Sequence, residues 1–339
     1  MTPVIFGCSG PQLSSGEVAF FRDCNPWAFI LFGRNIESPE QVRKLCADLR
    51  ESVGRDALIF TDQEGGRVQR LGPPLWRKAP WASLFDTLYD IDETAALRAI
   101  WLNFRLIAEE LRLAGITADC APVLDLPVFG ADPIVSDRAF STDKYRMVHM
   151  ADACMAGLID GGVVPVIKHM PGHGRATVDS HKSLPIIDTP IEILDETDFF
   201  PFKALAQAPM AMTAHVVLSE IDPKKPATIS KKVIDKIIRD RLGFDGLLMS
   251  DDLDMKALSG DLTQLTEQTL AAGCDIVLQC SGELPAMVKI AKGLPPLDGK
   301  SAERARIAEL MSDEWVPFDQ VDALREYEDI MRLLDKDDE

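Results

Sequence analysis

Short apolar runs alternate with longer amphipathic segments along the 339-residue chain. Eight of the apolar runs have the length of β-strands and are apolar on both faces, as is typical of strands buried in a parallel sheet. They span residues 4–8, 28–32, 57–62, 117–125, 163–170, 210–216, 246–252 and 275–279. The sequence therefore predicts eight buried strands.

Helical patterns lie between these runs, at residues 39–52, 92–114, 144–160, 195–208, 231–241, 261–272 and 283–293. Residues 14–23 are a weaker helix candidate after the first strand. Eight strand-then-helix units in a chain of this length favour a closed (β/α)8 barrel, of the TIM type, over an open doubly wound sheet. No low-complexity linker marks a boundary, so we expect one catalytic domain over residues 1–339, with 300–339 a helical, acidic extension packed on the barrel.

Six charged or imidazole side chains lie at the carboxyl ends of five of the predicted strands. They are Asp62, Asp125, Lys168, His169, His215 and Asp251. Any one of them could cap a helix or lie in a loop. Because the carboxyl ends of barrel strands converge on one mouth, where active sites are built, the six together predict one functional site.

Bulk properties exclude several classes of partner and compartment. The formal net charge of −18 is repelled by phosphate backbones and anionic lipid surfaces, so nucleic acid and membrane partners are not expected. The 7 cysteines are odd in number and widely separated, which is typical of reduced thiols. The sequence indicates neither a signal peptide nor a long apolar span. We expect a cytoplasmic monomer.

The segment "IKHMPGHGRATVDSHKSLP", residues 167–185, concentrates titratable groups and allows several interpretations. His169 and His173 have the spacing of zinc ligands on a helix, but Pro171 and the flanking glycines disfavour a helix here. A metal-dependent barrel hydrolase could still gather His169, His173, His215 and Asp251 from several strands. This metal site remains the alternative prediction.

A serine nucleophile is disfavoured in this segment. Ser180 lies between Asp179 and His181, but neighbours on an extended chain point to opposite sides, so a Ser–His hydrogen bond would be strained. The G-x-S-x-G elbow of many serine hydrolases is absent.

A proton donor fits the segment better. In an extended chain Asp179 and His181 project to the same side, so the carboxylate can orient one imidazole nitrogen while the other faces a substrate. Such a pair suits general acid–base work near neutral pH. Asp251 and Asp252 end another predicted strand, where we expect one to point into the barrel mouth and its neighbour away. An acid opposite a carboxylate is the pairing that glycoside cleavage needs.

Groups suited to a polyhydroxylated substrate surround this pair. Asp62 and Arg70 lie in "TDQEGGRVQRL", Arg138 in "SDRAFSTD", and Lys168 and His169 precede the proton-donor segment. Charged groups bind sugar hydroxyls through hydrogen bonds worth about 1.5–3 kcal/mol each. Arg67 is interpreted instead as scaffold that pairs with a neighbouring acid.

Two long motifs resemble the family-three glycoside hydrolases, in particular the bacterial N-acetyl-β-glucosaminidases of cell-wall recycling. The motifs are "KHMPGHGRATVDSHKSLP" and "IIRDRLGFDGLLMSDDLD". The resemblance extends, in the family's order, to "AFILFGRNI", "TDQEGGRVQRL", "DCAPVLDL" and "SDRAFSTD", and so covers most of the chain. Met170 and Asp254 depart from the usual residues of the two long motifs.

The resemblance implies a retaining exo-enzyme that removes N-acetylglucosamine β-1,4-linked to (anhydro)muramic acid in muropeptides, with no metal or organic cofactor. It implies that Asp251 is the nucleophile and that His181 is the acid/base with Asp179 as its dyad partner. The residues it implies for sugar binding are Asp62, Arg70, Arg138, Lys168 and His169. Larger relatives carry a second α/β domain, for which the C-terminal extension is too short. A sugar-binding protein without turnover remains a further alternative.

Overall fold

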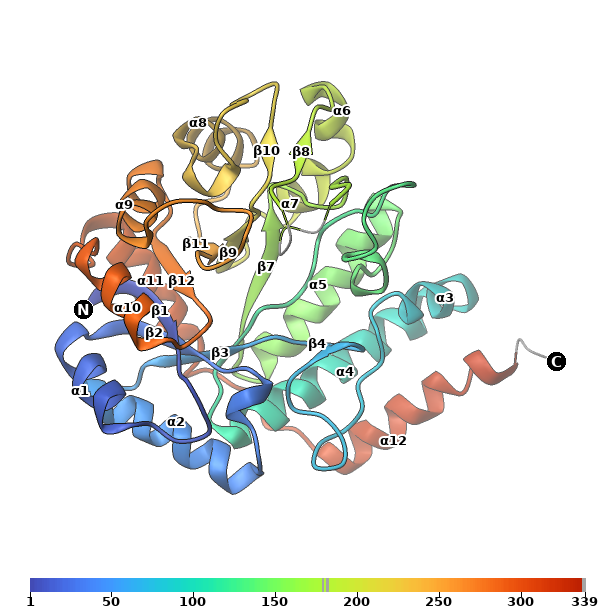
Figure 1. The fold of residues 1–339 in the computed structure, drawn as a ribbon. Coiled ribbons are helices and arrows are strands. Elements are labelled where there is room, and N and C mark those ends of the chain that lie inside the picture. Colours follow the sequence, from blue (N-terminus) through green and yellow to red (C-terminus); the bar gives the residue numbers. More distant parts are fainter. Residues whose placement is uncertain (179, 181–182, 337–339) are drawn as a thin grey trace.

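The computed structural model describes residues 1–178, 180 and 183–336. Eight parallel strands form a closed barrel and follow one another in chain order, with the last strand paired to the first (Figure 1). The strands are β1 (Thr2–Gly7), β2 (Pro26–Ile30), β3 (Leu58–Thr61), β6 (Ala118–Asp119), β7 (Val164–Met170), β9 (Met210–Thr213), β11 (Leu247–Asp252) and β12 (Ile276–Gln279). The predicted (β/α)8 barrel is confirmed.

Helices connect the strands and surround the barrel (Figure 1). They are α1 (Ser15–Cys24), α2 (Pro39–Val53), α4 (Glu93–Ala114), α5 (Lys144–Asp160), α6 (Ile191–Glu196), α7 (Phe199–Ala204), α8 (Lys231–Val233) with the π-helix η4 (Ile234–Arg241), α9 (Leu262–Ala272) and α10 (Leu284–Lys292). Local signals set several ends: Ser14 caps α1 in a capping box, and Gly115 ends α4 in the left-handed region at φ 88°. The helix predicted at 195–208 is two short helices, with a break at Thr197 and Asp198; Pro201 lies in the first turn of α7, where its missing N–H would have no helical partner.

Several short elements were not predicted from the sequence. They are α3 (Leu84–Ile91), the hairpin β4 (Gln63–Gly65) and β5 (Val68–Gln69), the paired strands β8 (Ile186–Ile187) and β10 (Val217–Leu218), and the 3-10 turns η1 (Gly33–Asn35), η2 (Ser136–Arg138), η3 (Ala227–Ile229) and η5 (Leu334–Lys336). Most span only two or three residues, too few for a hydrophobic period to be seen. The predicted strand 117–125 is likewise shorter, with β6 followed by an isolated bridge between Val123 and Lys168.

Side chains of the strands alternate between two hydrophobic layers. In β3, Leu58 and Phe60 pack inside the barrel, whereas Ile59 packs between the barrel and its helices. The interior layer is filled by large residues such as Trp27 and Met249. The barrel is therefore a packed core, and a ligand site has to lie at one of its ends.

The C-terminal helices α11 (Gly299–Met311) and α12 (Gln320–Met331) add to the barrel. Ala305 and Ala308 of α11 pack into the interior layer, and the Trp27 indole donates a hydrogen bond to Glu309 at 2.8 Å. Helix α12 lies beside α4 (Figure 1). Because Trp27 belongs to the start of β2, α11 closes the amino-terminal end of the barrel, and the carboxyl ends of the strands face the other way.

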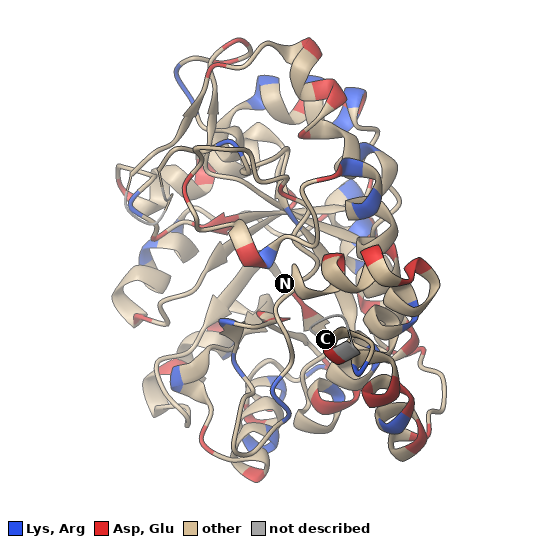
Figure 2. Cartoon of the chain, turned by 90° about the vertical axis from the view of Figure 1, so that its right-hand side faces the viewer, with Lys and Arg blue, Asp and Glu red and all other residues tan. Residues whose placement is uncertain are grey.

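In Figure 2 acidic and basic positions are interspersed along the helices and loops. Among the described residues, no helix combines the length and apolar character needed to cross a bilayer. All seven cysteines lie in the described part of the chain and are free thiols. Burial raises the pKa of several of them, Cys8 and Cys46 to about 12, so these thiols are protonated at neutral pH.

Candidate active site

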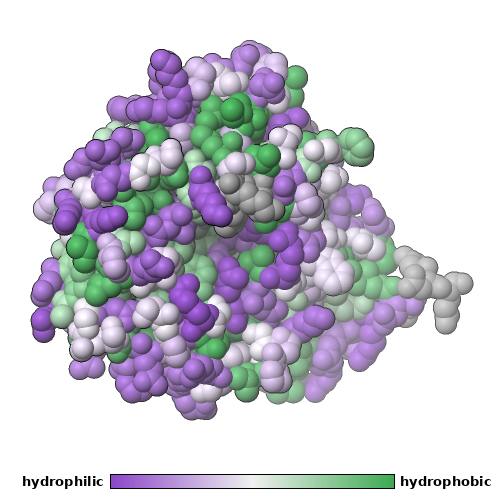
Figure 3. Space-filling view, in the orientation of Figure 1, coloured by the Kyte–Doolittle hydropathy of each residue, from purple (hydrophilic) through white to green (hydrophobic). Residues whose placement is uncertain are grey.

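A cavity of about 280 Å³ lies at the carboxyl ends of the strands. Hydrophilic residues surround a hollow on the face shown in Figure 3. Six predicted site residues line the cavity, namely Asp62, Arg70, Arg138, Lys168, His169 and Asp251. The remaining two, Asp179 and His181, lie outside the described residues. The barrel thus brings together residues that are up to 189 positions apart, between Asp62 and Asp251.

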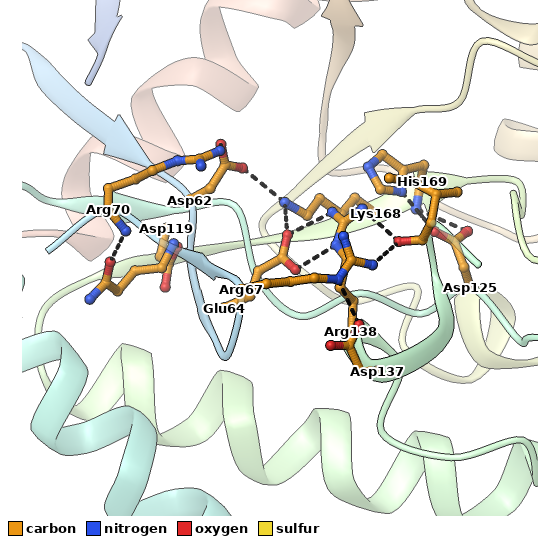
Figure 4. Close-up of polar contacts among 12 residues, drawn as sticks. Asp62, Glu64, Arg67, Arg70, Asp119, Asp125, Asp137, Arg138, Lys168 and His169 are labelled. Carbon is orange, nitrogen blue, oxygen red and sulfur yellow. Dashed lines mark hydrogen bonds and ion pairs between the residues drawn. The ribbon is translucent and has the colours of Figure 1, made fainter. Parts of the chain in front are cut away.

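Five charged side chains form a continuous chain along one wall (Figure 4). Arg70 donates to Asp62 at 2.9 Å, and Asp62 accepts from Lys168 at 2.9 Å. Lys168 also contacts Glu64 at 2.6 Å. Glu64 in turn accepts two parallel hydrogen bonds from Arg138, each 2.8 Å long. Alternating charges of this kind offer both donors and acceptors to a polyhydroxylated ligand.

Mutual pairing keeps the buried side chains of Lys168, Glu64 and Asp62 ionised. Burial alone would lower the pKa of Lys168, which is 2% exposed, but the Asp62 and Glu64 carboxylates raise it above its ordinary value. Burial would raise the pKa of Glu64, yet Lys168 and Arg138 lower it to about 2. The pKa of Asp62 is likewise held low, since Lys168 and Arg70 outweigh burial. All of these groups are charged at neutral pH.

The β4–β5 hairpin returns Arg70 to Asp62. Its turn contains Gly65 at φ 94° and Gly66 at φ 57°, conformations that side chains strain. A Cβ on Gly65 would lie 2.2 Å from a backbone oxygen of Pro80, so only glycine fits. The Gln63 side chain closes the hairpin by accepting the Arg70 N–H at 2.8 Å. The "DQEGGRVQR" motif therefore encodes a turn that places both Glu64 and Arg70.

His169 forms a second polar feature of the cavity. Its Nδ1 lies 2.7 Å from Oδ2 of Asp125, which is fully buried. Because an ionised carboxylate only accepts, Nδ1 carries the proton and Nε2 is left for the cavity. Asp125 also accepts the His173 backbone N–H at 2.6 Å. Burial would raise the pKa of Asp125, but the nearby His169 and His173 hold it below its ordinary value.

Asp251 and Asp252 both line the cavity, although the sequence predicted that only one of them would point into the barrel mouth. The register of β11 on β12 is irregular here, since three steps from Met249 to Asp252 match two steps on β12. Such an irregularity breaks the alternation of strand side chains. Burial, together with the Asp254 and Asp251 charges, raises the pKa of Asp252 to about 7. Asp251 accepts the Asp252 N–H at 2.8 Å.

The four residues of the alternative metal site are not gathered as ligands. His215 is fully buried, and its ring nitrogens contact the Thr228 hydroxyl at 2.7 Å and the Asp252 carbonyl at 2.9 Å. His173 and His215 do not line the cavity. Among the described residues, no group of three or more His, Cys, Asp or Glu side chains could hold a metal ion. The geometry offers no support for a His169, His173, His215 and Asp251 centre.

Sequence reasoning missed several residues of the site. Phe32 and Cys280 line the cavity, and Glu64 ties two of its cations together. The Phe32 ring lies between the Arg34 and Arg70 guanidinium groups, 5.0 and 5.4 Å from its centre. Phe32 lies two residues after β2, and Cys280 directly follows β12. Their position at a strand end could have indicated them, but only charged and imidazole residues at strand ends were predicted to belong to the site. Arg67 pairs with Asp137 at 2.8 Å, as its interpretation as scaffold predicts, but it also lines the cavity.

Comparison with known proteins agrees with this geometry. The model of the Glycosyl hydrolase family 3 N terminal domain matches residues 21–306. A Beta-hexosaminidase of Alkalilimnicola ehrlichii is 38% identical over 307 residues, which are 89% of this chain and 87% of that protein. The crystal structure of native NagZ from Neisseria gonorrhoeae superposes with a TM-score of 0.86 at 29% identity and 97% coverage of both chains. The same values hold for that NagZ in complex with N-trifluoroacetyl-D-glucosamine.

The chain belongs to glycosyl hydrolase family 3. It is a glycoside hydrolase of the β-hexosaminidase group, with the parallel barrel that NagZ has.

Proposed function

We propose that the protein is a retaining exo-β-N-acetylglucosaminidase that removes terminal N-acetylglucosamine from β-1,4-linked (anhydro)muramic acid in muropeptides. The observation that carries the proposal is a strand-end aspartate, Asp251, in a cavity that the charged side chains Asp62, Lys168 and Arg138 also line. The cavity volume of about 280 Å³ is smaller than that of most ligand pockets, which is about 300–1,000 Å³. A small cavity suits a single sugar ring, and so the removal of one sugar from the end of a glycan.

Each proposed residue has a chemical role. His181, oriented by Asp179, donates a proton to the glycosidic oxygen while Asp251 attacks the anomeric carbon and forms a covalent glycosyl-enzyme. Water then attacks the same carbon and gives its proton to His181, which restores both groups. The two displacements retain the anomeric configuration.

The polar wall holds the sugar. Asp62 and the cations Arg70, Arg138 and Lys168 bind hydroxyl and acetamido groups, and His169 adds its Nε2. Binding of N-trifluoroacetyl-D-glucosamine by the related NagZ supports an N-acetylglucosamine-type sugar here. No metal or organic cofactor takes part in these steps.

An imidazole acid explains the choice of leaving group. Once it has given its proton it is neutral, so it does not repel a departing sugar that carries a carboxylate, as a second carboxylate would. We therefore assign an anionic aglycone to the enzyme. The same proposal places it as a cytoplasmic monomer whose residues 1–339 form one catalytic domain, with neither nucleic acid nor membrane as a partner.

Trapping with a 2-fluoro or 5-fluoro N-acetylglucosamine analogue, followed by peptide mapping, tests the assignment. Label is expected on the peptide that contains Asp251, and the product of the first turnover should keep its anomeric configuration by NMR. Label on another peptide would overturn the nucleophile. Activity that is lost after exhaustive chelation and regained with a metal ion would restore the metal-dependent alternative.

A further inference from the structure

Glu64 is the one member of the charged wall that does not line the cavity. It lies in β4, and its side chain is 6% exposed. Its two oxygens contact Arg138 and Lys168, the two cations of the wall that come from elements far from β4 in the sequence. The carboxylate therefore ties η2 and β7 together at the place where both present a positive charge to the ligand.

The contacts use particular atoms of each cation. Arg138 gives Nε and Nη2 to Glu64, whereas its Nη1 makes, within the described part of the chain, only a 3.5 Å contact with the carbonyl of Ile134. One edge of the planar guanidinium is thus fixed, and the Nη1 end is left to meet a ligand. Lys168 is held between Glu64 at 2.6 Å and Asp62 at 2.9 Å, so its ammonium group has a fixed place.

We propose that Glu64 is a positioning residue for sugar binding, which sets the orientation of Arg138 and the place of the Lys168 ammonium group without touching the sugar itself. The inference rests on the proposed function, because it takes Arg138 and Lys168 as sugar-binding groups.

The two cations depend on Glu64 to different degrees. Apart from the Ile134 carbonyl, the hydrogen bonds recorded for the Arg138 side chain all go to Glu64, so its orientation is lost first when Glu64 is changed. Lys168 keeps Asp62 as a partner but loses one of the two carboxylates that raise its pKa. A change at Glu64 therefore affects geometry through Arg138 and pH dependence through Lys168.

Glu64→Gln and Glu64→Asp separate these effects. Glutamine keeps the shape but not the charge, and its amide NH2 faces cationic donors. Aspartate keeps the charge but is one methylene too short to span both cations. The matched control is Glu109→Gln on α4, because Glu109 also bridges two arginines, Arg112 at 2.6 Å and Arg105 at 3.4 Å, but does not line the cavity.

The experiment measures KM and kcat for an aryl N-acetylglucosaminide and the inhibition constant of N-acetylglucosamine from pH 6 to 10, together with the melting temperature. We expect KM and the inhibition constant to rise together by about tenfold in both Glu64 variants, because ground-state binding is lost, while kcat changes less. In Glu64→Gln binding should weaken further at alkaline pH, since Lys168 loses its proton at a lower pH than in the wild type, whereas Glu64→Asp keeps the wild-type profile. Glu109→Gln should alter only the melting temperature.

Values of KM and of the inhibition constant within twofold of the wild type in a folded Glu64 variant would overturn the inference. If Glu64→Gln does not fold, the inhibition constant of Glu64→Asp decides the question alone. Wild-type protein that neither cleaves the substrate nor binds N-acetylglucosamine refutes the proposed function, and the role of Glu64 with it. The wild-type measurement therefore distinguishes the two failures.

Discussion

Lys168→Met removes the buried ammonium group at the centre of the charged wall and tests how the wall is stabilised. Lys168 is 2% exposed and makes ion pairs of 2.9 Å with Asp62 and 2.6 Å with Glu64. Methionine fills a similar volume without the charge. Breaking a buried pair by removal of one partner costs about 3–5 kcal/mol, because the other charge is left buried.

The lower value, about 3 kcal/mol, is expected here. Each carboxylate keeps one guanidinium partner, Asp62 with Arg70 at 2.9 Å and Glu64 with Arg138 at 2.8 Å. An unfolding entropy of about 2.1 cal/mol/K per residue amounts to about 0.7 kcal/mol/K for this chain. The melting temperature should therefore fall by about 4 °C in thermal unfolding monitored by circular dichroism.

The pH dependence of that difference carries the stronger test. In the wild type the pKa values of Asp62 and Glu64 are lowered on folding, so their contribution to stability is complete above about pH 4 and is lost only in acid. In Lys168→Met, burial raises the carboxyl pKa values instead, and the folded state takes up a proton as the pH falls. The deficit should shrink from pH 8 to pH 5, by up to about 1.4 kcal/mol per pH unit for one proton.

The control is Lys44→Met, which removes an exposed i,i+4 ion pair with Asp48 on α2. Its effect should be at most about 0.5 kcal/mol and independent of pH over this range. A deficit in Lys168→Met that equals that of Lys44→Met, or that grows as the pH falls, would refute the account of the wall as a mutually stabilised ion network.

Further substitutions test the other parts of the site. Asp125→Asn should leave the protein folded but raise KM severalfold. The reason is that the amide can donate to Nδ1 of His169 and so move the imidazole proton to Nε2. A KM in steady-state kinetics that equals the wild-type value would contradict this. Gly65→Ala should lower the melting temperature by several degrees, since its Cβ meets a backbone oxygen at 2.2 Å, whereas Gly10→Ala has no atom within 4 Å and should be neutral. His181→Gly should reduce turnover of natural glycosides far more than that of activated aryl glycosides, and equal losses would argue against an acid role.

The sequence predicted the fold because the information is local. A strand that is apolar on both faces, or an amphipathic helix, can be recognised from a short stretch of sequence. The observed β7 and β11 accordingly differ from the predicted runs by a single residue at one end. Once eight such units are recognised, the convergence of strand ends at one mouth follows from the barrel. That is why Asp62, Lys168, His169 and Asp251 could be placed in one cavity before the structure was known.

Residues that follow strands were not all equivalent, and only the tertiary structure separated them. His215 has the same sequence setting as His169, yet it is buried against Thr228 and the Asp252 carbonyl, whereas His169 faces the cavity. Their difference lies in which neighbouring element fills the space beside each ring. Contacts of that kind join positions far apart in the sequence, and no window of residues contains them.

The sequence itself determined a (β/α)8 barrel, the end of the barrel at which the cavity lies and six of the charged and imidazole residues that line it. Tertiary structure decided that Asp251 and Asp252 share the cavity, that α11 closes the opposite end and that Glu64 links two cations of the wall. The physical reason is one of range. Hydrophobic period and turn chemistry act over a few neighbouring residues, whereas register irregularities and buried ion pairs depend on distant segments packed against one another.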